Sequence, residues 1–383
     1  MQVSRRQVQQ PKALSSESKR IIFDVQNDSW GILLFSILIY GFVVLNIASG
    51  TVVMKQGSFA NNVFKFIKVE QGGIPIKSNT AEFYRAFDGS VNKGVFPELC
   101  STAGASSDAD PITPVAGGAA VSVGTDGQYM NLKEHINIYF KNMYTPVESL
   151  QWKTALRTME RPKVQIIFEK EAFSNMLGTG NTSDITFGNL DDMYIDVYME
   201  ELVEQQAGEA RLPANTPDKL IYEIQEDVTI RANTKGGQVS DSLLGGGKEV
   251  ISYWMRMRNN FAGATNSNTG YAPSDSMIVD LKLRVDNVED WVQQTTWKQN
   301  KRSMFHRFGY LPVVTNSKTE MDGFNAFIFV DKFGKGAKLS REKSNINLVY
   351  STAADASTTF DSKTAKMQSV VHYYGDVILN RAA

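Results

Sequence analysis

The sequence predicts an all-β protein built from two domains. Apolar and polar residues alternate with a period of two in run after run, and Gly, Pro, Asn and Ser separate these runs, a pattern typical of a sandwich or barrel. Helical periodicity is confined to two short stretches. The length of 383 residues exceeds what one hydrophobic core normally serves and suits two domains of about 150–200 residues each.

Composition excludes several classes of protein. Hydrophobic residues make up 42% of the chain, enough for packed cores, and 40 Lys and Arg balance 41 Asp and Glu. The net charge of −1 therefore gives no bulk attraction to nucleic acid. The single cysteine, Cys100, excludes an intrachain disulfide and a thiolate metal cluster, which is consistent with assembly in a reducing compartment.

The first 20 residues are polar and basic, and we expect them to form an N-terminal arm. Five cations are opposed only by Glu17: Arg5, Arg6, Lys12, Lys19 and Arg20. One interpretation is a solvated, disordered tail. The functional one is an arm that touches phospholipid headgroups or a neighbouring subunit.

The segment at 31–48 is the one that could overturn an all-β assignment. Between Asp28 and Lys55 there is no charged residue, and the apolar run is long enough to cross a bilayer as a helix. The basic flank before it would suit a cytoplasmic anchor. Its Ile, Val, Phe and Tyr content suits a pair of buried strands as well, and periodicity alone cannot separate the two structures.

Strand patterns recur after this segment. The alternation is clearest at residues 64–69, 136–140, 164–168, 194–199, 222–224, 281–285, 346–350 and 370–374. Helices are expected at 81–87 and at 286–305, where Asp286 and Glu289 can cap the start. Loop-like composition at 101–127 and 261–276 predicts exposed loops.

The two halves carry their elements in a similar order, which indicates an internal repeat. The strand at 64–69 precedes the helix at 81–87, as the strand at 281–285 precedes the second helix. Further on, residues 164–168 are followed by 194–199, and residues 346–350 by 370–374. The comparison rests on pattern and predicts two copies of one β-domain.

This order of elements resembles the double-jelly-roll major capsid proteins of tailless icosahedral viruses with an internal membrane, the tectivirus and corticovirus type. The resemblance covers residues 21–380. It lies in four features: the apolar opening at 32–47, the turn Gln71-Gly72-Gly73, the strand at 194–199 and the closing residues 373–376. None of these features is a specific motif.

The resemblance implies two tandem eight-stranded jelly rolls, each with a short helix. The expected organisation is a basic arm at 1–20, a first jelly roll at 21–205, a linker at 206–217 and a second jelly roll at 218–380. It also implies a structural protein of a virion, assembled in the cytoplasm of its host, with bacteriophages among the viruses of this kind.

The implied partners follow from that role. The chain would form a homotrimer that contacts neighbouring trimers and vertex or minor capsid proteins in an icosahedral shell. The basic arm would face the internal lipid membrane, and the long loops would lie outside. No direct contact with nucleic acid is expected.

Two patterns that could mark a ligand or a switch have simpler explanations. The GGGK run at 245–248 resembles part of a phosphate-binding loop, but Glu249 stands where that loop needs Ser or Thr, so a flexible turn is favoured. His306 lies between Arg302 and Arg307 and could sense pH, although a surface histidine in a basic cluster is the ordinary interpretation.

Carboxylate pairs in loops are the only candidates for a metal site. They are Asp108 with Asp110 and Asp191 with Asp192. Calcium could bind there, but the spacing is not that of an EF-hand, so solvated loop carboxylates are favoured. We therefore expect no metal and no cofactor.

Aromatic and cationic residues are interleaved at one place in the second half. They are Tyr253, Trp254, Arg256 and Arg258. Stacking on nucleic-acid bases is one interpretation, and a strand with one charged face is the other.

No pairing of nucleophile and base or of catalytic carboxylates stands out, so the chain is not expected to be an enzyme. Two alternatives to the capsid role remain. One is a membrane-anchored adhesin or receptor-binding protein with a transmembrane helix near 31–48. The other is a carbohydrate-active β-sandwich enzyme, which would need a pocket that gathers carboxylates.

Overall fold

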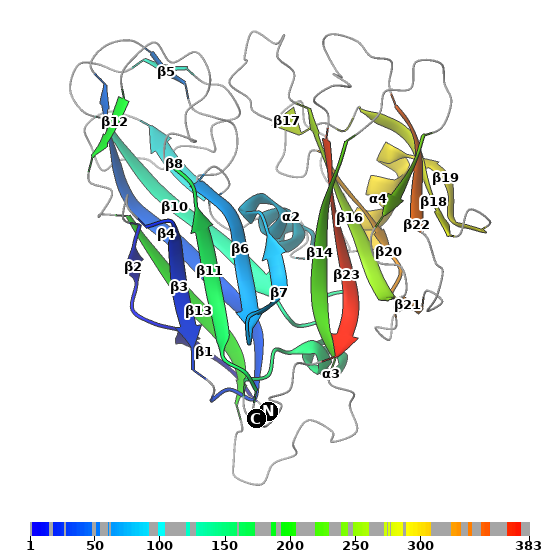
Figure 1. Cartoon of the computed structure of the whole chain (residues 1–383), viewed down its shortest axis with the longest axis horizontal. Helices are drawn as coiled ribbons and strands as arrows, with labels where there is room; N and C mark the ends of the chain where they lie inside the picture. Colours follow the sequence, from blue (N-terminus) through cyan, green and yellow to red (C-terminus); the bar gives the residue numbers. More distant parts are fainter. Residues whose placement is uncertain are drawn as a thin grey trace.

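A computed structural model gives the fold. It describes residues 2–14, 18–26, 28–47, 51–53, 60, 63–91, 99–103, 120–122, 128–158, 161–172, 185–188, 193–203, 219–229, 239–243, 248–259, 272–273, 275, 277–285, 289–307, 323–330, 336–338, 346–352 and 366–376. Within these residues the chain forms two β-sandwiches that stand side by side, with helix α2 between them (Figure 1).

The first sandwich has two antiparallel sheets. Its eight main strands are β1 (Gln2–Gln7), β3 (Arg20–Val25), β4 (Gly31–Ile47), β6 (Phe64–Gln71), β7 (Ile74–Asn79), β10 (Gln128–Tyr139), β11 (Val164–Lys170) and β13 (Met193–Val203). One sheet runs β1-β13-β4-β10 and the other β3-β11-β6-β7. Shorter strands extend the first sheet or pair with each other: β2 (Lys12–Ala13), β5 (Thr51–Val53), β8 (Leu99–Ala103), β9 (Ala120–Ser122) and β12 (Ile185–Gly188).

The second sandwich repeats this plan. Its main strands are β14 (Lys219–Thr229), β15 (Val239–Leu243), β16 (Glu249–Asn259), β18 (Ile278–Val285), β19 (Glu289–Thr296), β20 (Phe324–Ile328), β22 (Ile346–Thr352) and β23 (Lys366–Asp376). One sheet joins β14, β23, β16 and β20, and the other runs β15-β22-β18-β19. The short strands β17 (Ala272–Pro273) and β21 (Ala337–Lys338) pair with β16.

The strand order is the same in both halves. Counted along the chain, the main strands of each sandwich lie in the order first, eighth, third, sixth in one sheet and second, seventh, fourth, fifth in the other. This is a jelly roll in each half, so the predicted double jelly roll is confirmed. The strands that the sequence matched as a repeat, β11 with β22 and β13 with β23, are the seventh and eighth strands of their sandwiches.

Each jelly roll has a helix between its fifth and sixth strands. In the first it is α2 (Ala81–Val91), as the pattern at 81–87 predicts, and the hydroxyl of Thr80 accepts a hydrogen bond of 3.4 Å from the N–H of Phe83. In the second it is α4 (Trp297–Arg307). A short helix α3 (Glu148–Gln151) and a 3₁₀ turn (Trp152–Thr154) follow β10.

The helix predicted at 286–305 begins later than expected, which is a correction. Residues 289–296 form β19, which pairs with β18. Thr296 ends the strand and caps the helix, because its hydroxyl accepts the N–H of Gln299 at 3.2 Å while the Gln299 side chain accepts the N–H of Thr296 at 3.2 Å. This reciprocal capping box starts the helix at Trp297, after the β-branched residues that favour the strand.

The apolar segment at 31–48 contains one long strand rather than a pair of strands or a helix. β4 extends over Gly31–Ile47 and pairs with β13 on one side and β10 on the other. Ile37 and Ile39 face the core, with no exposed surface. Within the residues that the structure describes, no helix is long and apolar enough to cross a membrane.

The turn between β6 and β7 depends on glycine. Gly72 has a φ of 59° and Gly73 a φ of 78°, both in the left-handed region that side chains disfavour. A Cβ on Gly72 would also lie 2.8 Å from the Cβ of Pro162. The glycine pair that the sequence marked as a turn therefore has no simple replacement.

The predicted arm, linker and loops can be compared with the described residues only in part. Residues 2–14, assigned to the arm, hold β1 and β2, which pair with β13 at the edge of the first jelly roll. The predicted linker at 206–217 lies outside the described residues, as do most of the loops at 101–127 and 261–276.

One hydrophobic core cluster crosses from the first jelly roll into the second. It joins Phe83 and Phe87 of α2 with Trp254 of β16 and Val370 of β23. A separate cluster, with Tyr253 and Leu348, fills the second sandwich. The two jelly rolls therefore share buried apolar surface, and the junction between them is part of the folded core.

Candidate functional site: the junction of the two jelly rolls and the N-terminal edge

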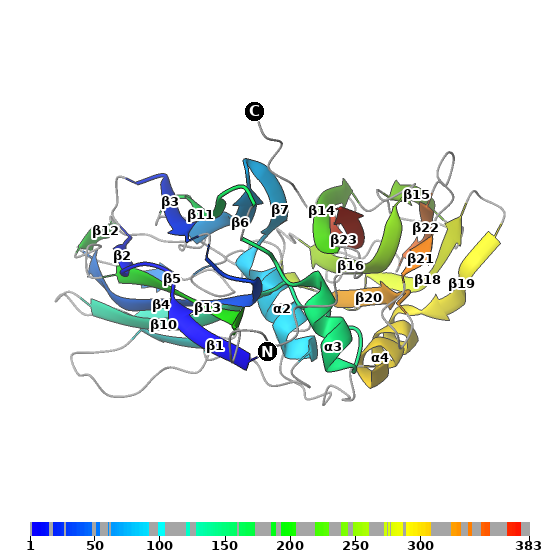
Figure 2. The same cartoon turned by 90° about the horizontal axis from the view of Figure 1, so that it is seen from below.

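Helix α2 forms the apolar part of the junction. Figure 2 shows it between the two sandwiches, beside the sheet that holds β14, β23 and β16. The Phe83 ring meets Trp254 edge-on at 5.9 Å between centroids, and Phe87 meets it at 5.4 Å. Both rings also lie against His372, at 5.8 and 5.5 Å. Such pairs add to the stabilisation from buried area.

A buried ion pair lies beside these rings. Glu223 of β14 and Lys77 of β7 each keep only 4% of their side-chain surface exposed, and the Lys77 Nζ lies 3.1 Å from Oε1 of Glu223. His372 of β23 adds its Nε2 at 3.3 Å from the same oxygen. The other carboxylate oxygen accepts hydrogen bonds from Asn79 at 3.1 Å and from the hydroxyl of Tyr84 at 3.4 Å.

Three of the donors come from one jelly roll, whereas the carboxylate and the fourth donor, His372, come from the other. Lys77, Asn79 and Tyr84 belong to the first, and Glu223 and His372 to the second. Charged groups this deeply buried persist only where the partner and the surrounding hydrogen bonds offset the cost of removing them from water. The cluster therefore selects one arrangement of the two sandwiches.

The hydroxyl of Tyr144 is the centre of a second polar group. It accepts the indole N–H of Trp254 at 2.8 Å and lies 2.7 Å from the hydroxyl of Ser252 and 2.8 Å from Nδ1 of His372. If Tyr144 donates to Nδ1, a neutral His372 carries its proton on Nε2, toward Glu223. This tautomer gives each group a consistent role.

Burial and charge set the pKa values in this cluster. Burial opposes ionisation of Glu223, but the Lys77 charge and the hydrogen bonds from His372 and Asn79 outweigh it and lower the pKa of Glu223 to about 2. Burial lowers the pKa of His372, although Glu223 opposes this shift. Burial raises the pKa of Tyr144 above its ordinary value. Near neutral pH the junction therefore holds ionised Glu223 and neutral His372.

The free energy of unfolding should fall on acidification because of this cluster. A carboxyl group with a folded pKa of about 2 and an unfolded value of 4.5 stabilises the fold above pH 4.5 and loses that contribution as pH falls from 4.5 to 2. The full loss is about 3 kcal/mol at 1.36 kcal/mol per pKa unit. His372 acts in the same direction below pH 6.5, since the unfolded state takes up its proton first.

Urea unfolding from pH 7 to pH 3 measures this dependence, with Glu223→Gln as the reference. The reference lacks the titrating carboxyl, so its stability should decline less steeply below pH 4.5. Equal slopes for the two proteins would contradict the assignment of the ionised state to Glu223.

A further ion pair joins α2 to β16. Arg256 is 2% exposed, pairs with Glu82 and has its guanidinium 4.5 Å above the ring of Phe324. Tyr253 and Trp254 are fully buried. These side chains cannot stack on nucleic-acid bases. The run does form a strand, β16, but Arg256 is buried in the junction and does not make a charged surface.

The five cations of the predicted arm do not gather on one surface. Arg5 and Arg6 lie on β1, near the end of the sheet where β4 begins. Arg20 is the first residue of β3, and its backbone lies opposite that of Glu169, near the end of β11. The carbonyl of Lys19 accepts the N–H of Lys170. The structure thus places Arg5 and Arg6 at one end of the first jelly roll and Lys19 and Arg20 at the other.

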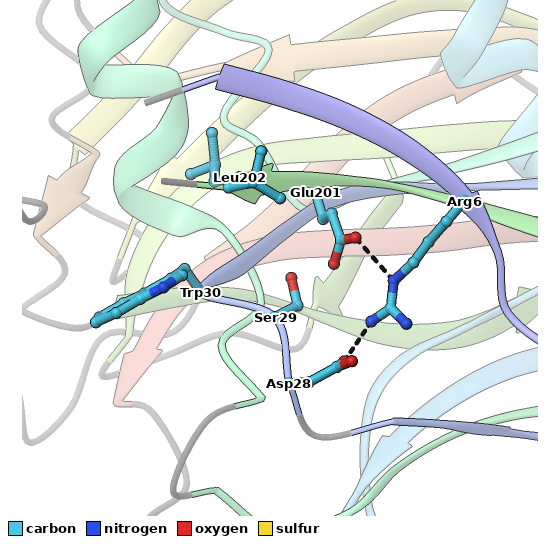
Figure 3. A pocket seen from close by; sticks show the side chains of 7 residues that line it. Arg6, Asp28, Ser29, Trp30, Glu201 and Leu202 are labelled. Atoms are coloured by element: carbon cyan, nitrogen blue, oxygen red, sulfur yellow. Dashed lines mark hydrogen bonds and ion pairs between the residues drawn. The ribbon is translucent and has the colours of Figure 1, made fainter. Parts of the chain in front are cut away.

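Two of these cations are used within the fold. Figure 3 shows Arg6 beside a pocket of about 350 Å³, where its Nε lies 2.7 Å from Oε1 of Glu201 and its other nitrogen pairs with Asp28. Lys12 donates to the carbonyl of Ile22, and its Nζ lies 4.9 Å above the ring of Phe23. Arg5 and Arg20 remain exposed, although Arg5 lies 4.9 Å from the centroid of the Tyr198 ring.

The remaining candidate sites from the sequence are a histidine, a glycine-rich run and two carboxylate pairs, and the structure describes only some of these residues. His306 is exposed on α4, and Lys248 lies 4.2 Å above the ring of Tyr373. The carboxylate pairs at 108–110 and 191–192 lie outside the described residues. In the part of the chain that the structure describes, no group of three His, Cys, Asp or Glu side chains could hold a metal ion.

Sequence reasoning missed the junction cluster. Lys77, Glu223 and His372 each stand in a strand, where a charged or titratable residue usually marks the solvent face. A single sequence cannot show that three such positions meet across two domains.

No model of a known protein family matches the sequence, and no curated protein matches it. Solved structures do match. The STIV major capsid protein superposes with a TM-score of 0.64 at 10% identity, over 98% of this chain and 97% of that one. The Faustovirus major capsid protein gives 0.55 at 11% identity over 99% and 91%. The major capsid protein P2 from Bacteriophage PM2 gives 0.52 at 10% over the whole of both chains.

At these identities the likeness establishes the fold alone. The chain has the double-jelly-roll architecture of these viral major capsid proteins, and each match covers at least 98% of its length.

Proposed function

We propose that this chain is a major capsid protein, a structural subunit that assembles as trimers into an icosahedral virion shell. The observation that carries the proposal is the match of fold, over almost the whole of both chains, to viral major capsid proteins. Each half of the chain is a jelly roll, and the buried junction fixes the two halves relative to each other.

The physical logic of a shell subunit supports this role. A shell needs rigid blocks with large complementary surfaces and no catalytic pocket. The crossing core cluster and the Lys77–Glu223 pair make one block from two sandwiches. In this proposal the chain is accordingly not an enzyme, and its binding partners are further copies of itself.

The wider setting follows from the same role. The protein would be assembled in the cytoplasm of its host, reside in the virion, and contact neighbouring trimers together with vertex or minor capsid proteins. No direct contact with nucleic acid is proposed, in keeping with a net charge of −1.

Contact with an internal membrane forms a narrower part of the proposal. Because Arg5 and Arg6 lie at one end of the first jelly roll and Lys19 and Arg20 at the other, the five cations cannot all face one surface. We assign membrane contact to the end of the first jelly roll where β1 begins.

Light scattering of protein purified without detergent tests the proposal. The expected species has a mass of about 128 kDa, three times the 42.6 kDa chain. A protein that is recovered only with detergent, or that remains a monomer at every concentration, would overturn it.

A further inference from the structure

Helices α2 and α4, which follow the fifth strand of their jelly rolls, can be aligned residue by residue. The side-chain oxygen of Thr80 caps α2 at the N–H of Phe83, and that of Thr296 caps α4 at the N–H of Gln299. Each helix has 11 residues and packs on the sixth strand of its own jelly roll, β10 or β20. Position by position, Ala81 of α2 therefore corresponds to Trp297 of α4.

The side of each helix that faces its own jelly roll is buried in both. On α2 this side carries Ala81, Arg85 and Asp88, and the corresponding residues on α4 are Trp297, Lys301 and Met304. Arg85 donates to the carbonyl of His135 at 3.1 Å, and Lys301 donates to Asp275 at 2.5 Å.

The other side of each helix differs. On α2, Glu82, Phe83 and Phe87 are covered by the second jelly roll, through Arg256, Trp254 and His372. The corresponding residues of α4 are Lys298, Gln299 and Ser303, and all three are exposed. The positions that α2 uses to bind a jelly roll are thus the ones that α4 presents to solvent.

The receiving sheet shows the complementary difference. In the second jelly roll, the first, eighth and third strands carry Glu223, His372 and Trp254 against α2, and these side chains are buried. In the first jelly roll, the corresponding strands are β1, β13 and β4. Their outward face carries Tyr194, which is 36% exposed, with Tyr40 and Tyr198 partly exposed.

This outward face, which we call the tyrosine face, comprises Tyr40, Tyr194, Tyr198 and Glu200, together with Arg5, which lies over the ring of Tyr198, and Asp196, which is only 5% exposed. Tyr40 and Tyr194 are cross-strand partners whose rings stack at 5.9 Å. The residues that alternate with them, such as Ile39 and Ile195, are fully buried toward the core. In Figure 2 the strands β1, β13 and β4 lie on the lower side of the first jelly roll, and α4 lies at the lower side of the second.

Charge and chemistry match between the tyrosine face and α4. The exposed side of α4 carries the cations Lys298 and Arg302. The tyrosine face offers aromatic rings together with the partly exposed carboxylate of Glu200, and cations bind both, as Arg5 already does at the ring of Tyr198. Tyrosine and arginine are also the residue types that most often carry binding energy at protein interfaces.

We propose that the exposed side of α4 in one copy of this chain docks on the tyrosine face of a second copy. The contact would repeat, between chains, the packing of α2 on the second jelly roll within the chain. It joins two different surfaces, so it passes from copy to copy in one direction and closes only as a ring. That the ring holds three copies rests on the proposed function; the contact itself rests on the two helices.

Charge reversal at both surfaces tests the docking. We expect Lys298→Glu with Arg302→Glu to give a folded monomer of 42.6 kDa, because two carboxylates then face Glu200 and the electron-rich faces of the tyrosine rings. Tyr194→Lys should do the same by placing a cation against Lys298. Combining Tyr194→Lys with Lys298→Glu restores opposite charges and should recover at least part of the oligomer.

Matched controls separate this contact from general effects of charge. Lys19→Glu with Arg20→Glu makes the same change in net charge at exposed positions elsewhere, and Val279→Lys adds a cation at a residue that is 46% exposed on β18. Both controls should keep the wild-type mass. Circular dichroism melting of every variant verifies the fold.

Cross-linking provides a measurement that does not depend on loss of assembly. A chain with Tyr194→Cys and Gln299→Cys, treated with a bismaleimide, should give covalent dimers and trimers. Each single variant, which retains Cys100, should give neither.

The outcomes distinguish the two proposals. An oligomeric wild type whose mass survives both charge variants, with no cross-linked product, would overturn the docking contact and leave the capsid role intact. A wild type that is monomeric at every concentration would overturn the capsid role as well.

Discussion

Replacing Lys77 with methionine should lower the free energy of unfolding by about 3–5 kcal/mol, the range found when one partner of a buried ion pair is removed. Glu223 would then remain ionised at a site where its side chain is 4% exposed, with Asn79, Tyr84 and His372 as its remaining neighbours. Urea unfolding at pH 7 measures the loss.

The controls for this prediction use the same chain. Lys68→Met removes a cation from an ion pair of 2.5 Å with Glu169, but the two side chains are 23% and 29% exposed, so the expected loss is below about 1 kcal/mol. Adding Glu223→Gln to Lys77→Met removes the uncompensated charge and should regain at least half of the loss. Equal losses for Lys68→Met and Lys77→Met would show that the junction pair is not special.

Replacing Trp254 with alanine should cost a similar amount, about 3–5 kcal/mol, through the cavity that it leaves. The indole is fully buried between Phe83 and Phe87, and its N–H donates to the hydroxyl of Tyr144 at 2.8 Å. The two jelly rolls meet at this residue, so the variant should also weaken their association. Chemical unfolding monitored by far-ultraviolet circular dichroism, a signal from the backbone, measures the loss of stability.

A conservative variant separates the contribution of the aromatic ring to stability from that of the hydrogen bond. Trp254→Phe keeps most of the aromatic contact and loses the N–H, with an expected cost of about 1–3 kcal/mol. Val147→Ala, at a residue that is 42% exposed, should change stability by less than about 0.5 kcal/mol. If Trp254→Ala were as stable as Val147→Ala, the junction would not be part of the folding core.

The sequence predicted the class of fold because its signals are local. Alternation at 164–168, 194–199, 346–350 and 370–374 marks strands that occupy equivalent places in the two jelly rolls. The segment at 31–48 was ambiguous because a strand buried on both faces and a lipid-facing helix have the same composition. Pairing with β10 and β13, which decides it, is a long-range property.

The candidate site was much less accessible to sequence reasoning. Lys77, Glu223 and His372 are separated by more than a hundred residues, and each one alone resembles a surface position in a strand. Two cations of the predicted arm, Arg6 and Lys12, find partners within the first jelly roll, and the contact of this arm with a membrane stays a prediction. Net charge in a segment does not reveal which of its cations the fold will use.

Electron cryo-microscopy of the purified protein tests the capsid role most directly. We expect three-fold particles in which each chain contributes two jelly rolls, with α4 of one chain against β1, β13 and β4 of the next. At high concentration these particles should form closed shells or flat lattices. Isolated single chains, or particles in which the chains meet only through flexible segments, would contradict it.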